Sequence, residues 1–189
     1  MKRIGVLALQ GDFEKHKQIL KTIGCDSLEV RTVEQLKKSD ALIIPGGEST
    51  TLSKLFHEFN LIGHIQKYSQ SHPVMGTCAG LILLSKNVEE FPYSLLGLID
   101  ITVKRNAYGR QKESFCSKIQ IDLPEGKKDY LGVFIRAPKI INYGNNVKAI
   151  AKYHDDVVMV LSDNILACTF HPELTNDPVI HEFFINTFL

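Results

Sequence analysis

One cysteine of the sequence lies in a pattern that fits a nucleophile. Residues 76–80 are Gly-Thr-Cys-Ala-Gly, between an apolar run at 74–76, predicted to be a strand, and residues 81–84, predicted to continue as a helix. In such a turn, small neighbours permit a strained backbone that exposes one side chain at the carboxyl end of a sheet. The helix N-terminus favours a thiolate at Cys78, and the backbone N–H of Ala79 is placed to bind an oxyanion.

The alternative for Cys78 is a small, buried apolar residue, which is what isolated cysteines commonly are. The flanking glycines and the strand-to-helix context favour the nucleophile. The other cysteines lack such surroundings, because Cys25 follows a helix end, Cys116 lies in a polar stretch and Cys168 lies within a strand. We therefore expect those three to be structural.

A thiol nucleophile needs a base, and the base needs a group that fixes its tautomer. Among the seven histidines His171 fits best, because it ends the apolar run 165–170 and precedes Pro172 and Glu173. A carboxylate there can accept from one ring nitrogen and leave the other for Cys78. A bare His-Pro-Glu tripeptide is more often an ordinary loop, so the assignment depends on the cysteine turn. The remaining histidines are predicted to be solvated surface residues: His16, His57, His64, His72, His154 and His181.

The secondary structure that must position these residues is predicted to differ between the two halves of the sequence. In the first half, short apolar runs alternate with amphipathic stretches, which is typical of βα units over a parallel sheet. The second half is rich in strand-like runs separated by Gly, Asn and Asp. Strands are predicted at 4–9, 28–30, 41–44, 74–76, 101–103, 119–123, 131–135, 147–151, 157–161 and 165–169. Helices are predicted at 12–23, 52–59, 62–68, 81–84 and 178–188.

These patterns of strands and helices predict one α/β domain over residues 1–189. We expect a three-layer sandwich with a mostly parallel central sheet, which the antiparallel pairs of the β-rich second half join. The length suits a single domain. With 44% hydrophobic and 23% charged residues, the composition is that of an ordinary globular protein.

Charge and hydropathy exclude several classes of partner. The formal net charge is +1 and no long run of Lys and Arg occurs, which argues against nucleic acid. No stretch approaches the ~20 apolar residues of a membrane span, and the N-terminus does not have the pattern of a signal peptide. The scattered cysteines have no metal-ligand spacing. We therefore expect no membrane association, no metal, and a reduced, cytoplasmic setting.

The loop at 45–51, Pro-Gly-Gly-Glu-Ser-Thr-Thr, adds a third motif. With the cysteine turn and the distant His-Pro-Glu, it resembles the triad-type (class I) glutamine amidotransferases. Within them it resembles the glutaminase subunits of pyridoxal 5′-phosphate synthases. The segments 5–11, 105–111, 132–138 and 170–175 are also similar to that family. The resemblance runs from residue 4 to the end, and the motifs are highly specific together although each alone is not.

The resemblance implies hydrolysis of L-glutamine by a triad of Cys78, His171 and Glu173. It further implies that glutamine is held by Gly47, Glu48, Ser49, Arg105, Ile135 and Arg136, and that Gly47 and Ala79 supply the oxyanion hole. Without the resemblance, Glu48 would be a helix-capping acid and Ser49 a turn residue. Arg105 and Arg136 would be ordinary surface arginines, although each lies beside small or apolar residues at a predicted strand end.

The resemblance also implies a partner. The glutaminase step needs no metal or organic cofactor, and its ammonia must reach a separate synthase subunit, which implies a large hetero-oligomer. Docking of that subunit is expected to complete the oxyanion hole, so the isolated chain should be poorly active. Residues 12–15 (Asp-Phe-Glu-Lys) and Lys139 depart from the family pattern, and the departures bear on docking rather than on the triad.

Three rival functions remain. The first is a glutaminase that serves another synthase, such as that of histidine biosynthesis, which the segments 105–111 and 132–138 disfavour. The second is a cysteine peptidase of the same architecture, which the 45–51 loop and the adjacent His171 and Glu173 disfavour. The third is a non-catalytic binding subunit, against which the intact Cys-His-Glu set argues.

Overall fold

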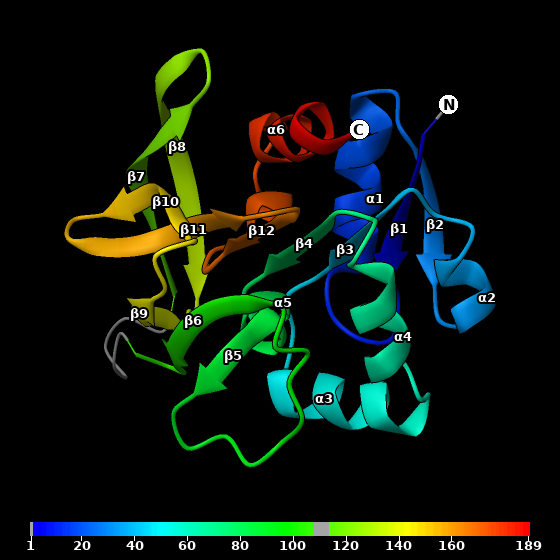
Figure 1. The fold of residues 1–189 in the computed structure, drawn as a ribbon. Coiled ribbons are helices and arrows are strands. Elements are labelled where there is room, and N and C mark those ends of the chain that lie inside the picture. Colours follow the sequence, from blue (N-terminus) through cyan, green and yellow to red (C-terminus); the bar gives the residue numbers. More distant parts are fainter. Residues whose placement is uncertain (1, 108–113) are drawn as a thin grey trace.

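A large mixed β-sheet forms the centre of the protein (Figure 1), whose computed structural model describes residues 2–107 and 114–189. Within these residues nine strands follow the order β2-β1-β3-β4-β12-β11-β10-β7-β8. Neighbours are parallel from β2 to β12 and antiparallel from β12 to β8. The strands are β1 (Arg3–Leu7), β2 (Asp26–Val30), β3 (Ala41–Ile44), β4 (Val74–Thr77), β7 (Ser114–Leu123), β8 (Gly126–Ile135), β10 (Lys148–Tyr153), β11 (Asp156–Ser162) and β12 (Ile165–Cys168).

The parallel strands are buried on both faces. Every residue of β3, β4 and β12 is buried, which is typical of parallel strands covered by helices on each side. In β3, Leu42 and Ile44 pack in one apolar cluster and Ile43 in another, because successive side chains point to opposite faces. The sheet therefore has a separate core on each face.

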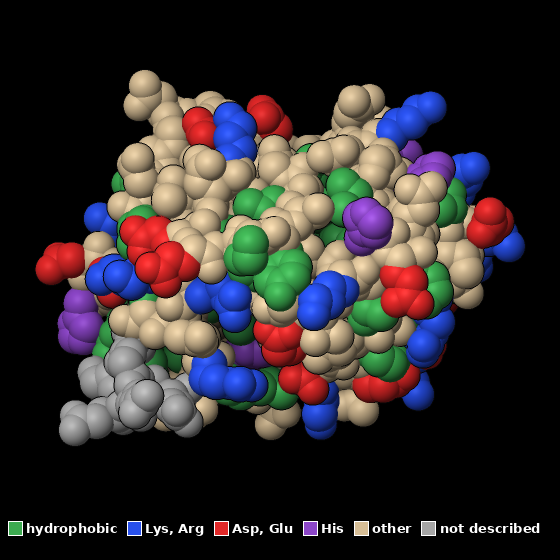
Figure 2. All heavy atoms as spheres, turned by 90° about the horizontal axis from the view of Figure 1, so that it is seen from below, with side chains coloured by type: hydrophobic (Ala, Val, Ile, Leu, Met, Phe, Trp, Pro, Cys, Tyr) green, Lys and Arg blue, Asp and Glu red, His purple; other side chains and the backbone are tan. Residues whose placement is uncertain are grey.

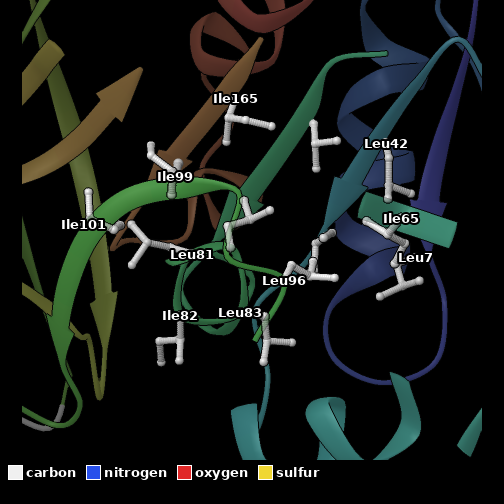
Figure 3. Packing of buried hydrophobic residues seen from close by; sticks show 14 of the residues in the cluster. Leu7, Leu42, Ile65, Leu81, Ile82, Leu83, Leu96, Ile99, Ile101 and Ile165 are labelled. Carbon is white, nitrogen blue, oxygen red and sulfur yellow. The ribbon is translucent and has the colours of Figure 1, made fainter. Parts of the chain in front are cut away.

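Helices cover both faces of the sheet. Leu20 of α1 (Phe13–Thr22) and Phe184 of α6 (Val179–Phe188) pack in the cluster that contains Ile43. Four helices contribute to the opposite cluster, part of which is drawn in Figure 3: α2 (Val33–Leu36), α3 (Ser49–Glu58), α4 (Ile62–Tyr68) and α5 (Ala79–Leu84). This arrangement is the predicted three-layer α/β sandwich.

A second, smaller sheet corrects part of the sequence prediction. β5 (Ser85–Val88), β6 (Ile99–Lys104) and β9 (Lys139–Tyr143) pair in the order β5-β6-β9. Residues 101–103, expected in the main sheet, lie in β6. Strand β9 was not predicted, because its sequence lacks the alternation of apolar and polar residues that marks a strand. In the structure only Ile140 of this strand is buried.

The three motifs meet because of strand order. β4 pairs with β3 on one side and with β12 on the other, all parallel. Their carboxyl ends therefore lie side by side, and they lead into the 45–51 loop, Cys78 and His171. Open α/β sheets bind their ligands at such an edge.

One face of the molecule carries charged side chains of both signs. On the face shown in Figure 2, Lys and Arg side chains are interspersed with Asp and Glu. None of the helices in the described ranges is long and apolar enough to cross a membrane.

Candidate active site

Cys78 lies on a strained turn between β4 and α5. Its φ is 48° and its ψ is −101°, a region that non-glycine residues rarely adopt and that concentrates at functional sites. The turn is tightly packed, because a Cβ on Gly76 would lie 2.4 Å from Leu84 Cδ1 and one on Gly80 would lie 2.1 Å from the Ile44 carbonyl oxygen. The predicted tight turn between strand and helix is therefore present, and both glycines are required by contact.

This packing makes a stability prediction. Gly80→Ala should lower the free energy of unfolding by about 1–3 kcal/mol, because the new methyl group meets backbone that cannot move aside. Gly63→Ala is the matched control, since Gly63 is exposed in helix α4 with nothing within 4 Å of its Cβ position. That control should stabilise the protein by about 0.5–1 kcal/mol. Chemical denaturation of both variants measures the difference, and equal stabilities would contradict the packing.

His171 and Glu173 form a buried pair just beyond β12. The 3₁₀ turn Pro172–Leu174 brings the carboxylate back onto the imidazole, with Glu173 Oε1 2.7 Å from His171 Nδ1. The backbone N–H of His171 donates to the Val133 carbonyl at 2.8 Å, which anchors the ring to β8. An ionised carboxylate only accepts, so we assign the proton to Nδ1. The buried Nε2 has no hydrogen-bond partner among the described residues and is left for Cys78.

The side chains of Cys78 and His171 converge beside Gly46. A Cβ on Gly46 would lie 3.3 Å from Cys78 Cβ and 2.5 Å from His171 Cε1, so only a glycine leaves room for both side chains. The thiol of Cys78 also donates to the Ile135 carbonyl at 3.9 Å. Three segments far apart in the sequence thus supply one small site.

The electrostatics favour a charged base. Burial alone would lower the pKa of His171, but the neighbouring Cys78 and Glu173 side chains raise it to about 10. Burial raises the pKa of Glu173, yet the attraction of the His16 ring when it is protonated and the hydrogen bond from His171 outweigh it and hold that pKa below its usual value. Cys78 and Glu173 thus both favour the protonated form of His171, and a protonated imidazole beside a cysteine stabilises a thiolate.

A pocket of about 240 Å³ opens in front of Cys78 and His171. It is smaller than the ~300–1,000 Å³ of sites for drug-sized ligands, so it suits a small metabolite. All the predicted glutamine-binding residues line it: Gly47, Glu48, Ser49, Arg105, Ile135 and Arg136. The buried Ala79 is the first residue of α5, directly after Cys78. Of the segment 105–111, residues 108–111 lie outside the described residues.

Two of these residues also have local structural roles. Glu48 caps helix α3, accepting from the backbone N–H of Thr50 at 3.1 Å and of Thr51 at 2.7 Å. Its carboxylate is 3.9 Å from the Arg105 guanidinium, which lies over the Phe91 ring at 5.1 Å. The capping acid foreseen from the sequence is therefore real, and it does not remove Glu48 from the pocket.

The comparisons with known proteins agree with this geometry. The SNO glutamine amidotransferase family matches residues 6–189. The chain belongs to this family. A pyridoxal 5′-phosphate synthase subunit PdxT of Thermosipho africanus is 49% identical, over 97% of each chain. The PdxT of Thermotoga petrophila is 47% identical, over 97% of each chain.

Solved structures place this member of the SNO family in the same fold. A crystal structure described as a glutamine amidotransferase superposes with a TM-score of 0.92 at 44% identity, over 97% of each chain. The PurLQS structure from Thermotoga maritima superposes with a TM-score of 0.76 at 14% identity, over 98% of each chain, and shares the fold alone.

Sequence reasoning missed Gln10 of this SNO-family site. Its side-chain oxygen accepts from the backbone N–H of Glu48 at 3.0 Å, and a Cβ on Gly47 would lie 2.5 Å from that oxygen. Gly47 has a φ of 151°, which favours glycine. Gln10 therefore holds the loop that carries Gly47 and Glu48. The contact spans 38 residues, and nothing in the local sequence signals it.

Two histidines predicted to lie on the surface are instead fully buried. His16 of α1 and His181 of α6 have no exposed area, which corrects the prediction for both. Helical spacing held a signal, because His16 lies three residues after Phe13 and three before Ile19 on the apolar side of its helix. His181 likewise lies three residues before Phe184.

Residues 12–15 and Lys139, which depart from the family pattern, lie in different surroundings. Asp12 lines the pocket, and its carboxylate belongs to a group with His171 and Glu173 whose polar atoms lie within 4.8 Å of one another. Lys139, at the start of β9, pairs with Asp156 at 2.6 Å. Asp12 thus adds a negative charge at the rim of the site.

Proposed function

We propose that this chain is the glutaminase subunit of a pyridoxal 5′-phosphate synthase, which hydrolyses L-glutamine to L-glutamate and ammonia. The observation that carries the proposal is the thiol of Cys78, held on a strained turn against the His171–Glu173 pair at the bottom of a small polar pocket. Membership of the SNO family and the names of the PdxT relatives support it.

The reaction proceeds through a thioester. The sulfur of Cys78 attacks the side-chain carbonyl carbon of glutamine after the thiol proton has passed to His171. The imidazolium gives that proton to the departing ammonia as the carbon–nitrogen bond breaks, which leaves a γ-glutamyl thioester. His171 then takes a proton from water, whose oxygen attacks the thioester, and returns it to the sulfur as glutamate leaves. The step uses no metal or organic cofactor.

Backbone donors stabilise the negative oxygen of each tetrahedral intermediate. We assign them to the N–H groups of Ala79, at the start of α5, and of Gly47, in the loop after β3. Removing one such donor from a comparable site costs about 3 kcal/mol of transition-state stabilisation. Glycine at position 47 lets the backbone approach the substrate closely.

The remaining pocket residues bind the amino-acid end of glutamine. Arg105 and Arg136 offer positive charge to its carboxylate and Glu48 offers negative charge to its ammonium group. Ser49 and Ile135 complete the wall. Arg136 has a φ of 43° directly after β8, a strained position that supports a functional role.

The ammonia has a destination outside this chain. Free ammonia is largely protonated near neutral pH, so it must pass directly to a synthase subunit in a hetero-oligomer. We place the amidotransferase domain over residues 1–189 and the assembly in the cytoplasm, where the four free cysteines remain reduced.

A glutamine-analogue label tests the assignment. The chain, mixed with a pyridoxal 5′-phosphate synthase subunit, is treated with 6-diazo-5-oxo-L-norleucine and mapped by mass spectrometry, with excess glutamine as competitor. We expect one adduct at Cys78 that glutamine suppresses, and glutamate release that rises when the synthase is added. Labelling at another residue would refute the site. Equal glutamate release with and without the synthase would refute the partner.

A further inference from the structure

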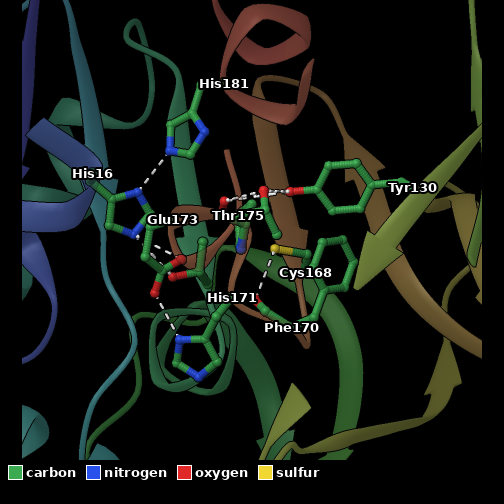
Figure 4. A network of polar contacts seen from close by, with 10 residues as sticks. His16, Tyr130, Cys168, Phe170, His171, Glu173, Thr175 and His181 are labelled. Carbon is green, nitrogen blue, oxygen red and sulfur yellow. Dashed lines mark hydrogen bonds and ion pairs between the residues drawn. The ribbon is translucent and has the colours of Figure 1, made fainter. Parts of the chain in front are cut away.

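A buried histidine pair lies directly behind the carboxylate of Glu173. His16 Nε2 is 3.4 Å from Glu173 Oε2, on the side of the carboxylate opposite His171. His16 Nδ1 is 2.9 Å from His181 Nε2. Figure 4 shows the row that runs from His181 on α6 through His16 on α1 to Glu173 and His171. The row links two helices to the residue that orients the base.

The protonation states in this row follow from burial. Burial lowers the pKa of His16 despite the neighbouring Glu173, and burial lowers the pKa of His181 to about 3. Asp12 and His171 are the other ionisable groups that act on His16. Both buried imidazoles are therefore neutral near pH 7, and each carries a single N–H.

The two possible arrangements of the protons leave different buried atoms unpaired. If His181 Nε2–H donates to His16 Nδ1, then His16 carries its proton on Nε2, which lies 3.3 Å from Thr77 Oγ1 and 3.4 Å from Glu173 Oε2. His181 Nδ1 is then an unpaired acceptor. The reverse arrangement sets the lone pair of His16 Nε2 against the carboxylate and leaves His181 with an unpaired buried N–H. Unpaired buried donors are the rarer and costlier defect, so the first arrangement holds.

The second carboxylate oxygen explains why such a donor matters. Glu173 Oε1 accepts from His171, but Oε2 is buried and has no hydrogen-bond partner in the part of the chain that the structure describes. The contact of Oε2 with His16 Nε2 at 3.4 Å is within ion-pair distance but is not a hydrogen bond in this structure, and hydrogen bonds of catalytic groups are often poorly aligned until the substrate binds. Without this N–H, one oxygen of a buried carboxylate would face no donor at all.

His16 also contacts the strand that carries the nucleophile. Thr77 Oγ1, one residue before Cys78, is 3.3 Å from His16 Nε2. The same imidazole thus touches both the end of β4 and the carboxylate that orients the base.

We propose that His16 is a positioning residue for the reaction: its Nε2–H holds Glu173 in the rotamer that orients His171, and His181 fixes the tautomer of His16. The proposal rests on the proposed glutaminase function. In metal sites, mutating a residue that hydrogen-bonds to a metal-bound histidine typically lowers metal affinity or activity by about 10- to 100-fold. We expect an effect of similar size here.

The first test separates the N–H from the bulk of the ring. His16→Leu removes the donor, whereas His16→Gln keeps an N–H near the place of Nε2. In the presence of the synthase subunit, we expect His16→Leu to lower kcat for glutamine hydrolysis by about 10- to 100-fold with KM within about threefold. His16→Gln should recover most of that loss. A kcat for His16→Leu within twofold of wild type, or no recovery with glutamine, would overturn the proposal.

The second test distinguishes positioning from loss of stability. Alkylation of Cys78 by iodoacetamide is followed against pH in the isolated chain, with Cys116→Ala in every variant to remove the exposed thiol. We expect His16→Leu to move the profile to higher pH, because a loosened Glu173 supports the imidazolium less. Ile19→Ala, a buried change on the same helix, is the control and should leave the profile in place. If the pH profile of Cys78 alkylation is the same in His16→Leu as in wild type, His16 does not position Glu173 and has only a structural role.

Different results would contradict the glutaminase assignment and the positioning role of His16. If the glutaminase assignment is wrong, Cys78→Ala retains glutamate release whatever residue 16 is. If only the positioning role is wrong, Cys78→Ala is inactive while His16→Leu behaves as wild type.

Discussion

Cys78→Ala is expected to abolish glutamine hydrolysis, with a loss in kcat of roughly 10⁶-fold, the size found when a triad nucleophile is removed. The reaction needs a sulfur at the bottom of the pocket. Cys168 cannot replace it, because its thiol is fully buried, donates to the Phe170 carbonyl at 3.4 Å and has a pKa that burial raises well above the usual value. The oxyanion donors alone would support only a small residual rate.

The variant should nevertheless fold. The side chain of alanine is smaller than that of cysteine, so it fits the same backbone conformation at φ 48°. The contacts of Gly76 and Gly80 stay unchanged. Glutamate release with the synthase present measures the loss, and thermal unfolding measures the fold. Cys78→Ser is the isosteric control and should be almost as inactive, because a hydroxyl is a much weaker acid than a thiol. Hydrolysis by Cys78→Ala within 100-fold of the wild-type rate would point to another nucleophile.

The parts of the site that depend on local sequence could be predicted. The tight turn around Cys78 needs glycines on both sides, and those glycines are visible in the chain. The strand run before His171 and the proline after it locate the base in the same way. The parallel order of β3, β4 and β12 then brings the motifs to one edge. The βα pattern predicts a mostly parallel sheet, but it does not predict that β12 lies beside β4. Their roles in glutamine binding remain predictions.

The parts that depend on contacts between distant segments could not be predicted. His16 and His181 are 165 residues apart and satisfy each other, so each alone resembles a solvated polar residue on a helix. The small sheet was missed because β9 buries too little to show a strand period. Gln10 was missed because its partner is backbone, which carries no residue-type signal.

Glu173→Gln is expected to lower kcat by about 10³- to 10⁴-fold, the size found when an aspartate that orients a catalytic histidine is replaced by its amide. An amide can present an N–H to His171 Nδ1. The imidazole would then carry its proton on Nε2, where it cannot accept the thiol proton of Cys78. The shape of the side chain is preserved, and a buried charge is removed together with its desolvation cost, so the fold should persist.

The same substitution should change the pH dependence. Glu173 is one of the two groups that raise the pKa of His171 to about 10. In Glu173→Gln this pKa should fall, so the imidazolium that supports the Cys78 thiolate is lost at lower pH. Iodoacetamide alkylation of Cys78 across pH measures the shift, and Glu173→Asp, which keeps the charge on a shorter side chain, should retain more of it. An alkylation profile that is unchanged in Glu173→Gln would show that the carboxylate does not act on the base.

Combining this variant with His16→Leu tests how the two residues are connected. If His16 acts only by holding Glu173, its Nε2–H has no carboxylate to orient once residue 173 is an amide. The double variant should then be about as active as Glu173→Gln alone, within about threefold, whereas independent effects would multiply to a further 10- to 100-fold loss. A multiplied loss would mean that His16 acts on Cys78 by another route, and its contact with Thr77 at 3.3 Å is then the path to examine.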